Sequence, residues 1–348
     1  MENGKGGRRI FAVGYFNPIA PKGTAVVSRN FIPMVEKYID ALCEVYFPWP
    51  GIVNARGFTG NMEEMREQLV GDLRWCREHG LALDLLINGT CYGEKTATVQ
   101  MHAEIAAALR DLDSLGLLPE IITTTLPFVG RVLKREFPKI EVRASVNMRL
   151  NSTLALDYIE PLFDSFYIGR DIQRDFPTLK KFRKWADDHG KKLCMLANSG
   201  CLRNCPGQTM HETILAHGVM PFDEGRNIEF SPVFCDNIYG RGGFEEFLRA
   251  TWIRPEDIDL FTPYASVFKL STRKVIDPEP ILKAYASGSY DGDLAKIVDP
   301  RPFFPFHTVD NKSFPDDWAT GGVAGLCAID CTHCGRCREV LRRVFKRK

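Results

Sequence analysis

Eight of the eleven cysteines in this chain of 348 residues fall into two groups. The first group comprises Cys194, Cys201, Cys205 and Cys235, and the second comprises Cys327, Cys331, Cys334 and Cys337. The first residues hold no long apolar stretch of the signal-peptide type, and no apolar run reaches the ~18 residues that span a bilayer. We therefore expect a cytoplasmic protein without membrane contact, whose cysteines remain thiols. Clustered thiols in a reducing compartment indicate metal ligands or redox groups before disulfides.

The second group has the spacing Cys327-x3-Cys331-x2-Cys334-x2-Cys337, which places four thiols within eleven residues. Ferredoxin-type motifs use the same close spacing, because a loop folded around a cubic cluster needs cysteines about two residues apart. Structural zinc sites usually take two ligand pairs separated by a longer segment. The spacing favours a 4Fe–4S cluster at this C-terminal motif, with zinc as the alternative.

The first group follows an apolar strand-like run that contains Cys194 and continues into a glycine-containing loop with Cys201 and Cys205. A strand end and such a loop bring soft thiolates close together, and Cys235 is expected to complete the set. This pattern favours another 4Fe–4S cluster, with zinc as the chemical alternative. For Cys194 a structural interpretation stays open, since a lone cysteine in an apolar strand is often a small core residue. We expect one or two clusters in the chain.

The segments that must position these thiols alternate between strand-like runs and helix-like periods. Strands are expected at Arg9–Phe16, Ala41–Phe47, Leu81–Ile87, Glu120–Leu126, Glu141–Met148, Ser165–Gly169, Lys192–Ala197 and Ala265–Leu270. Helices are expected between and after them at Phe31–Ile39, Asn61–His79, Ala97–Leu115, Phe128–Phe137, Thr153–Leu162, Pro177–His189 and Pro280–Ala286. Eight successive βα units predict an α/β fold of the (β/α)8 TIM-like barrel type, with a doubly wound open sheet as the alternative.

The expected division of the chain follows from these elements. Residues 1–290 should form the barrel, with a cysteine-containing insertion at about 199–257. Residues 291–348 should form a C-terminal extension that carries the ferredoxin-like motif.

Polar side chains follow several of the predicted strands, and in a barrel the C-terminal strand ends hold the chemistry. These positions include Asn147, Arg149, Arg170, Lys269 and Arg273. In the fifth strand a period of two puts Arg143, Asn147 and Arg149 on one face. If that face is the lumen, Arg143 needs a ligand or a neighbouring carboxylate as partner.

Four short motifs between Glu141 and Arg273 carry a resemblance. They are ASVNMRLNSTLALDYI, FYIGRDIQRDFPTLKKF, the Ser-Gly-Cys after the seventh strand, and VFKLSTR. This stretch resembles the peptidase U-32 family, also called the collagenase-like peptidases. The resemblance implies a barrel and a 4Fe–4S cluster held by four cysteines near the seventh strand, two of them with the six-residue gap that separates Cys194 from Cys201. Cys205 and Cys235 would fill the remaining roles.

The chain departs from the family pattern in three places. The family's Lys-Ile-Glu-Gly-Arg stands here as Lys-Leu-Ser-Thr-Arg, so that Ser271 replaces a glutamate. The gap between Cys201 and Cys205 is shorter than usual, and the C-terminal cysteine motif is an addition.

Family members include oxygen-independent hydroxylases. The resemblance therefore implies iron–sulfur-dependent redox or hydroxyl-transfer chemistry at the barrel mouth, on a small anionic or aromatic substrate or on RNA. Charge-assisted contacts to an anion would come from Asn147, Arg149, Arg170, Lys269 and Arg273. A peptidase, as the family name says, is one alternative, although the sequence shows no nucleophile–base arrangement. The other is a non-catalytic iron–sulfur protein that accepts electrons from a donor protein. A net charge of +1 gives no general attraction to nucleic acid, and only the basic C-terminal segment keeps RNA open as a partner.

Overall fold

Eight parallel strands form a closed barrel in the computed structural model, which describes residues 9–15, 31–55, 62–216, 234–273, 275, 277–302, 304–320, 331 and 333–348. The strands are β1 (Phe11–Gly14), β2 (Leu42–Phe47), β3 (Ala82–Ile87), β4 (Ile121–Thr124), β5 (Glu141–Ala144), β6 (Ser165–Tyr167), β7 (Lys192–Leu196) and β8 (Val267–Lys269). They pair in chain order, and the pairing of Ala12 with Lys269 joins β1 to β8. The predicted (β/α)8 TIM-like barrel is confirmed, and the open sheet is excluded.

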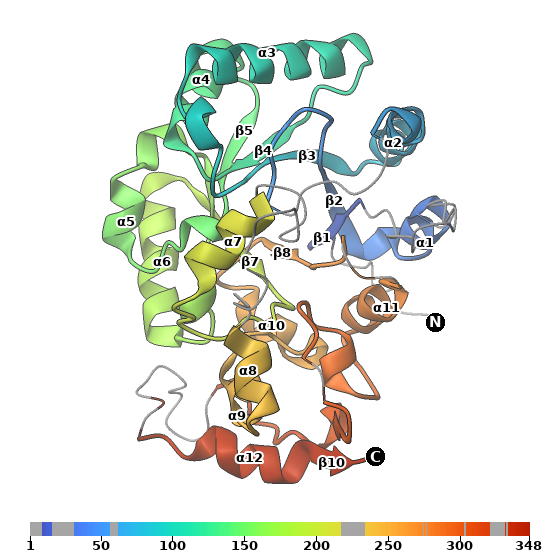
Figure 1. Cartoon of the computed structure of the whole chain (residues 1–348), viewed down its shortest axis with the longest axis vertical. Helices are drawn as coiled ribbons and strands as arrows, with labels where there is room; N and C mark the ends of the chain where they lie inside the picture. The colour runs from blue at the N-terminus through green and yellow to red at the C-terminus, as the bar shows by residue number, and fades with distance from the viewer. Residues whose placement is uncertain are drawn as a thin grey trace, which may run out of the picture.

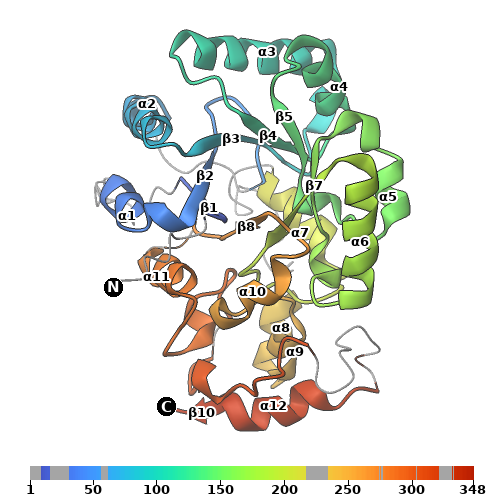
Figure 2. The same cartoon turned by 180° about the vertical axis from the view of Figure 1, so that it is seen from behind.

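Helices surround the barrel on its outer side (Figures 1 and 2). Those that follow the strands are α1 (Phe31–Lys37), α2 (Met62–Glu78), α3 (Val99–Ser114), α4 (Pro127–Glu136), α5 (Thr153–Asp157), α6 (Phe176–His189) and α11 (Glu279–Ser287). The insertion between β7 and β8 contains α7 (Gln208–Ala216), α8 (Phe234–Gly240), α9 (Glu245–Arg249) and α10 (Ile258–Phe261). None of the helices in the described ranges is long and apolar enough to cross a membrane.

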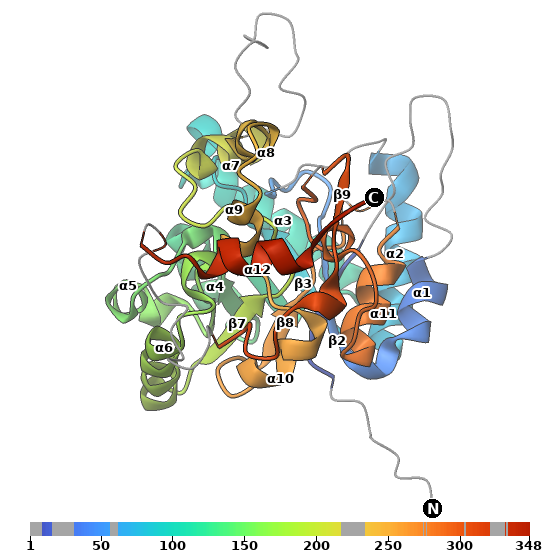
Figure 3. The ribbon, with the colours of Figure 1, turned by 90° about the horizontal axis from the view of Figure 1, so that it is seen from below.

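The C-terminal extension packs against the insertion. Its elements are β9 (His307–Val309), α12 (Arg336–Val344) and β10 (Phe345–Arg347), and β10 pairs antiparallel with β9. Helix α12 lies beside α9 (Figure 3). The ring of Trp252 stacks on that of Trp318 at a centroid distance of 5.7 Å, and the extension shares one hydrophobic core with the barrel. The division into domains at residue 290 stays a prediction.

The fifth strand is shorter than predicted, and this changes where its last side chains lie. β5 ends at Ala144, and the chain then forms a 3-10 turn over Val146–Met148. Arg149 follows in the left-handed region with φ of 54°. The period of two therefore stops before Asn147, so the prediction that Arg143, Asn147 and Arg149 share one strand face is wrong.

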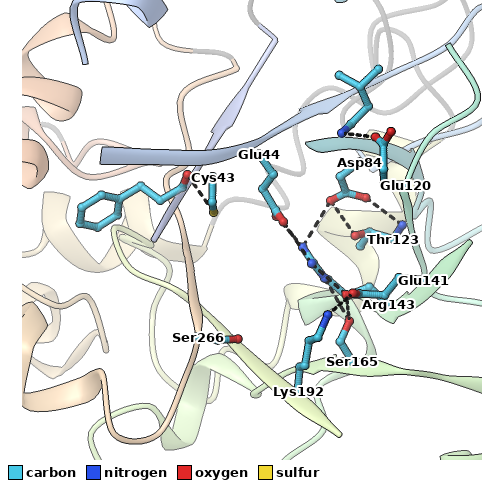
Figure 4. Close-up of polar contacts among 12 residues, drawn as sticks. Cys43, Glu44, Asp84, Glu120, Thr123, Glu141, Arg143, Ser165, Lys192 and Ser266 are labelled. Atoms are coloured by element: carbon cyan, nitrogen blue, oxygen red, sulfur yellow. Dashed lines mark hydrogen bonds and ion pairs between the residues drawn. The ribbon is translucent and has the colours of Figure 1, made fainter. Parts of the chain in front are cut away.

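The lower part of the barrel lumen is polar and tightly paired (Figure 4). Arg143 of β5 is 2% exposed and forms ion pairs with Glu44 of β2 and, at 3.0 Å, with Glu141. Its Nε donates to the Ser165 hydroxyl at 3.1 Å. Arg143 thus lies in the lumen and is held by neighbouring carboxylates. Because an isolated buried charge is costly, this pairing lets the barrel enclose a guanidinium.

Candidate functional site

A cavity of about 80 Å³ lies above this network, at the C-terminal ends of the strands. Four of the five side chains predicted for substrate binding line it, namely Asn147, Arg170, Lys269 and Arg273. The remaining wall includes the aromatic residues Tyr46 and Tyr167, the amide of Asn88 and the carboxylate of Asp299. Three cations thus face one carboxylate among the lining residues that the structure describes, which favours an anionic ligand.

Lys269, the last residue of β8, is buried between two aromatic rings. Its Nζ lies 3.6 Å from the ring centroid of Tyr46 and 5.6 Å from that of Tyr167. No residue within the described ranges accepts a hydrogen bond from this nitrogen. Burial lowers the pKa of Lys269 to about 8, although the nearby carboxylate of Asp84 acts in the opposite direction. The cation–π contacts stabilise the ammonium only in part.

The hydroxyl of Tyr167 is a second unsatisfied group in the cavity. This side chain is 1% exposed, and its oxygen has no hydrogen-bond partner in the part of the chain that the structure describes. Burial raises its pKa well above the ordinary value, so the hydroxyl keeps its proton. A buried hydroxyl of this kind is available to a ligand.

Arg170 connects the cavity to the insertion. Its Nη2 forms an ion pair with Glu212 of α7 at 2.5 Å, and its Nη1 donates to the Cys201 sulfur at 3.4 Å. Arg149 shares the same carboxylate at 3.1 Å and donates to the Thr209 hydroxyl. Arg149 is therefore placed beside α7 rather than in the cavity wall. Because two guanidiniums share one carboxylate, the group as a whole stays positive.

The segment that replaces the family's Lys-Ile-Glu-Gly-Arg is fixed by loops from far along the chain. The side chain of Asn198 accepts from the Ser271 backbone N–H at 2.6 Å. The Ser271 hydroxyl donates to Asp299, and Arg273 donates to Asn54 at 2.7 Å. Asp299 thus brings a carboxylate beside the position where the family motif has its glutamate.

The loop after β7 lies close to the chain around Asp299. Ser199 forms a parallel bridge with Asp299, and the Gly200 N–H donates to the Asp299 carbonyl at 3.0 Å. A Cβ at Gly200 would lie 2.3 Å from the carbonyl oxygen of Pro300, so only glycine fits there. This close approach fixes Cys201, which comes next in the chain.

Three of the four cysteines in the first group lie on neighbouring segments of the insertion, two on a loop and one in α8. A Cβ at Gly207 would lie 2.2 Å from the Phe234 ring, so the loop of Cys205 abuts the start of α8, which carries Cys235. Burial raises the pKa of Cys235 to about 11, and negative charge at Asp236 and Cys201 adds to this effect. Cys201 and Cys235 are therefore near enough to interact.

Cys194 is separated from these three. Its side chain is fully buried in the lumen with Val146, Tyr167 and Leu196. Burial raises the pKa of its thiol to about 12, against the effect of the Arg143 guanidinium. The structure does not bring Cys194 together with the other three, and no three Cys, His, Asp or Glu side chains in the described ranges are arranged as a metal site. As a set of four, the predicted ligands do not fit a cluster.

The C-terminal cysteine motif lies against the same loop. The Cys331 sulfur accepts a hydrogen bond from Arg203, between Cys201 and Cys205, at 3.8 Å. Cys334 is exposed and Cys337 lies in the first turn of α12. Cys327 falls outside the described residues. The two cysteine groups are thus adjacent in space, although more than ninety residues separate Cys235 from Cys331 in the sequence.

Comparisons with known proteins agree with the barrel. No family model matches the chain. The "Uncharacterized protease MJ1657" of Methanocaldococcus jannaschii is 23% identical over 321 residues, which cover 88% of this chain and 89% of that protein. The solved structure of the U32 peptidase Mk0906 aligns with a TM-score of 0.54 and 13% identity, over 79% of this chain and 97% of that one. The second match concerns the fold alone. The chain is thus similar in sequence to a protein named as a protease, and similar in fold to a U32 peptidase.

Proposed function

We propose that this chain is an enzyme that binds a small anionic substrate in the cavity at the C-terminal end of its barrel. The observation that carries this proposal is the excess of positive charge in the cavity, where Arg170, Lys269 and Arg273 face the single carboxylate of Asp299 among the described lining residues. Binding sites of small molecules are concave, with mostly apolar walls and a few converging polar groups. The volume of about 80 Å³ favours a short acid over an extended RNA segment.

Replacement of Arg273 by methionine is expected to lower the affinity for pyruvate, used as a small carboxylate probe, by about 10- to 100-fold. A hydrogen bond to a charged group contributes about 1.5–3 kcal/mol, and about 1.4 kcal/mol corresponds to one factor of ten. Calorimetric titration at pH 7 measures the change, and circular dichroism verifies folding. The control is Lys95→Met, whose side chain is 47% exposed and outside the cavity. Equal losses in both variants, or no binding to the wild type, would contradict the proposal.

We further propose that the chemistry is iron–sulfur-dependent redox or hydroxyl transfer. Cys201, Cys205 and Cys235 would have to draw closer together to hold a 4Fe–4S cluster, because they are not arranged as a metal site in the described structure. Cys201 and Cys205 lie on a loop that abuts the start of α8, which carries Cys235. Arg170 contacts Cys201 and also lines the cavity. When bound, such a cluster supplies one-electron transfer. The C-terminal motif would bind a second cluster, or zinc as the alternative. The hydrogen bond from Arg203 places Cys331 beside the first group. The motif would therefore pass electrons from a donor protein to the first cluster.

The iron content of cysteine variants tests this part of the proposal. Anaerobically purified Cys201→Ala is expected to lose the iron and acid-labile sulfide of the first cluster, whereas Cys194→Ala should retain them because its thiol lies in the lumen. Metal analysis with paramagnetic resonance of the reduced protein distinguishes none, one or two clusters and detects zinc. Equal iron loss in the two variants would return Cys194 to the ligand set, and an iron-free wild type would end the cluster proposal.

Peptidase action is the alternative carried by the relatives' names. The described residues that line the cavity include no histidine and no cysteine, so they provide no nucleophile–histidine pair. The cavity therefore favours chemistry on a small bound anion over attack on a peptide bond.

A further inference from the structure

Lys269 is buried in a way that its structural role does not explain. Buried lysines are ordinarily paired with a carboxylate, because an ammonium out of water is costly. The lumen carboxylate of Glu44 is instead taken by Arg143. Asp84 accepts hydrogen bonds from Thr123 and lies 3.9 Å from Arg143. What remains for Lys269 is contact with the two tyrosine rings.

The groups that face this lysine keep its amine partly neutral. Tyr46 and Glu44 come from β2, Asp84 from β3, Arg143 from β5 and Tyr167 from β6, while Arg273 follows β8. Burial and the two guanidiniums favour the free amine, and the two carboxylates oppose this less strongly. A lysine that is desolvated and close to other cations is an activated nucleophile.

The remaining cavity groups fit an acid with a carbonyl next to its carboxylate. Arg170 and Arg273 present guanidiniums that match the carboxylate. Tyr167 presents a protonated hydroxyl without a partner among the described residues, which suits a carbonyl oxygen. The volume limits the ligand to a few carbon atoms.

We propose that Lys269 is a catalytic nucleophile that forms a protonated imine with the carbonyl carbon of a short 2-oxo acid. The amine nitrogen bonds to the carbonyl carbon, and the C=O π electrons move to the oxygen, which takes up a proton as the nitrogen loses one. The resulting hydroxyl is protonated and leaves as water while the nitrogen lone pair closes the C=N bond. No oxidant or reductant is consumed. This inference rests on the proposed function, since the same cavity must first admit the acid.

Reductive trapping tests the imine directly. The full-length protein is incubated with pyruvate and sodium borohydride, and the modified peptide is identified by mass spectrometry. We expect the reduced pyruvate adduct on Lys269 of the wild type. Lys269→Arg removes the nucleophilic amine, so it should show no adduct at residue 269, and circular dichroism verifies that the variant is folded.

The pH dependence of the labelling rate separates a nucleophilic Lys269 from a lysine with only a structural role. With a pKa of about 8, the labelling rate of Lys269 should rise about tenfold from pH 7 to pH 9 and then level off. Exposed lysines, with an ordinary pKa of about 10.4, should continue to rise. Pyruvate binding with labelling confined to surface lysines overturns the imine and leaves the proposed function intact. A wild type that binds no pyruvate overturns both.

Discussion

Replacement of Arg143 by methionine is expected to lower the free energy of unfolding by about 3–5 kcal/mol. The guanidinium is the partner of Glu44 and Glu141, and it lies 3.9 Å from Asp84. Its removal leaves these carboxylates facing one another in a lumen closed to water, and charges uncompensated in this way account for most of the cost. Natural domains are stable by only about 5–15 kcal/mol, so the loss is a large fraction of the total. Urea-induced unfolding measures it.

Two matched variants make this prediction specific. Arg183→Met removes a guanidinium from a surface pair with Asp187, whose side chain is 65% exposed, and should cost less than about 0.5 kcal/mol. The double variant with Glu44→Met should recover part of the loss, because one uncompensated carboxylate is gone. A loss in Arg143→Met as small as that in Arg183→Met would show that the lumen does not depend on the network.

Trp252→Ala is expected to lower the free energy of unfolding by about 3–5 kcal/mol and to weaken the packing of the C-terminal extension. The indole is 1% exposed, packs on Phe247, Phe314 and Trp318, and donates its N–H to the Phe247 carbonyl at 2.8 Å. Truncation leaves a large void where insertion and extension meet. Urea-induced unfolding gives the stability change, and limited proteolysis should cleave the extension faster than in the wild type.

The controls for this variant separate volume from hydrogen bonding. Trp252→Phe keeps a ring but leaves a carbonyl without its donor, so a smaller loss of about 1–2 kcal/mol is expected. Leu154→Ala, at a side chain that is 56% exposed, should change stability by less than about 0.5 kcal/mol. If all three variants behaved alike, the proposed packing role of Trp252 would be refuted.

The barrel was predictable from the sequence because parallel strands buried on both sides leave a strong local pattern. β2, β3 and β7 agree with their predicted ranges within one residue at each end. The predicted helix at Thr153–Leu162 instead ends as α5 at Asp157 and resumes as a short 3-10 turn over Glu160–Leu162. Pro161 in that turn has no N–H to continue the helical bonding.

The candidate site was predictable where polar residues lie at a strand end or within a few residues after it, as Asn147, Arg170, Lys269 and Arg273 do. Lys269 and Arg170 lie in the cavity because the ends of β8 and β6 open into it. Arg149 does not, because its left-handed backbone turns the chain toward α7. The sequence pattern did not show that β5 ends at Ala144, so the turn that follows could not be predicted.

Residues brought by long-range packing have no local signal. Asp299 reaches the cavity through a backbone bridge with Ser199, and Glu212 reaches Arg170 from a helix of the insertion. Likewise, the six-residue gap between Cys194 and Cys201 suggests a shared site, whereas the alternation along β7 directs Cys194 into the lumen. Whether the six-residue gap or the alternation along β7 decides the position of Cys194 depends on how the barrel closes. The sequence pattern does not contain this information.

The single guanidinium of Arg170 takes part in two interactions that bear on function. The same group lines the cavity and donates to the Cys201 sulfur. An anion in the cavity and negative charge at that sulfur therefore compete for one cation, and each weakens the other's interaction by the same free energy. Occupancy of the cavity and the electrostatic state of the cysteine loop are thus reciprocal quantities, and a titration of either one reports on the other.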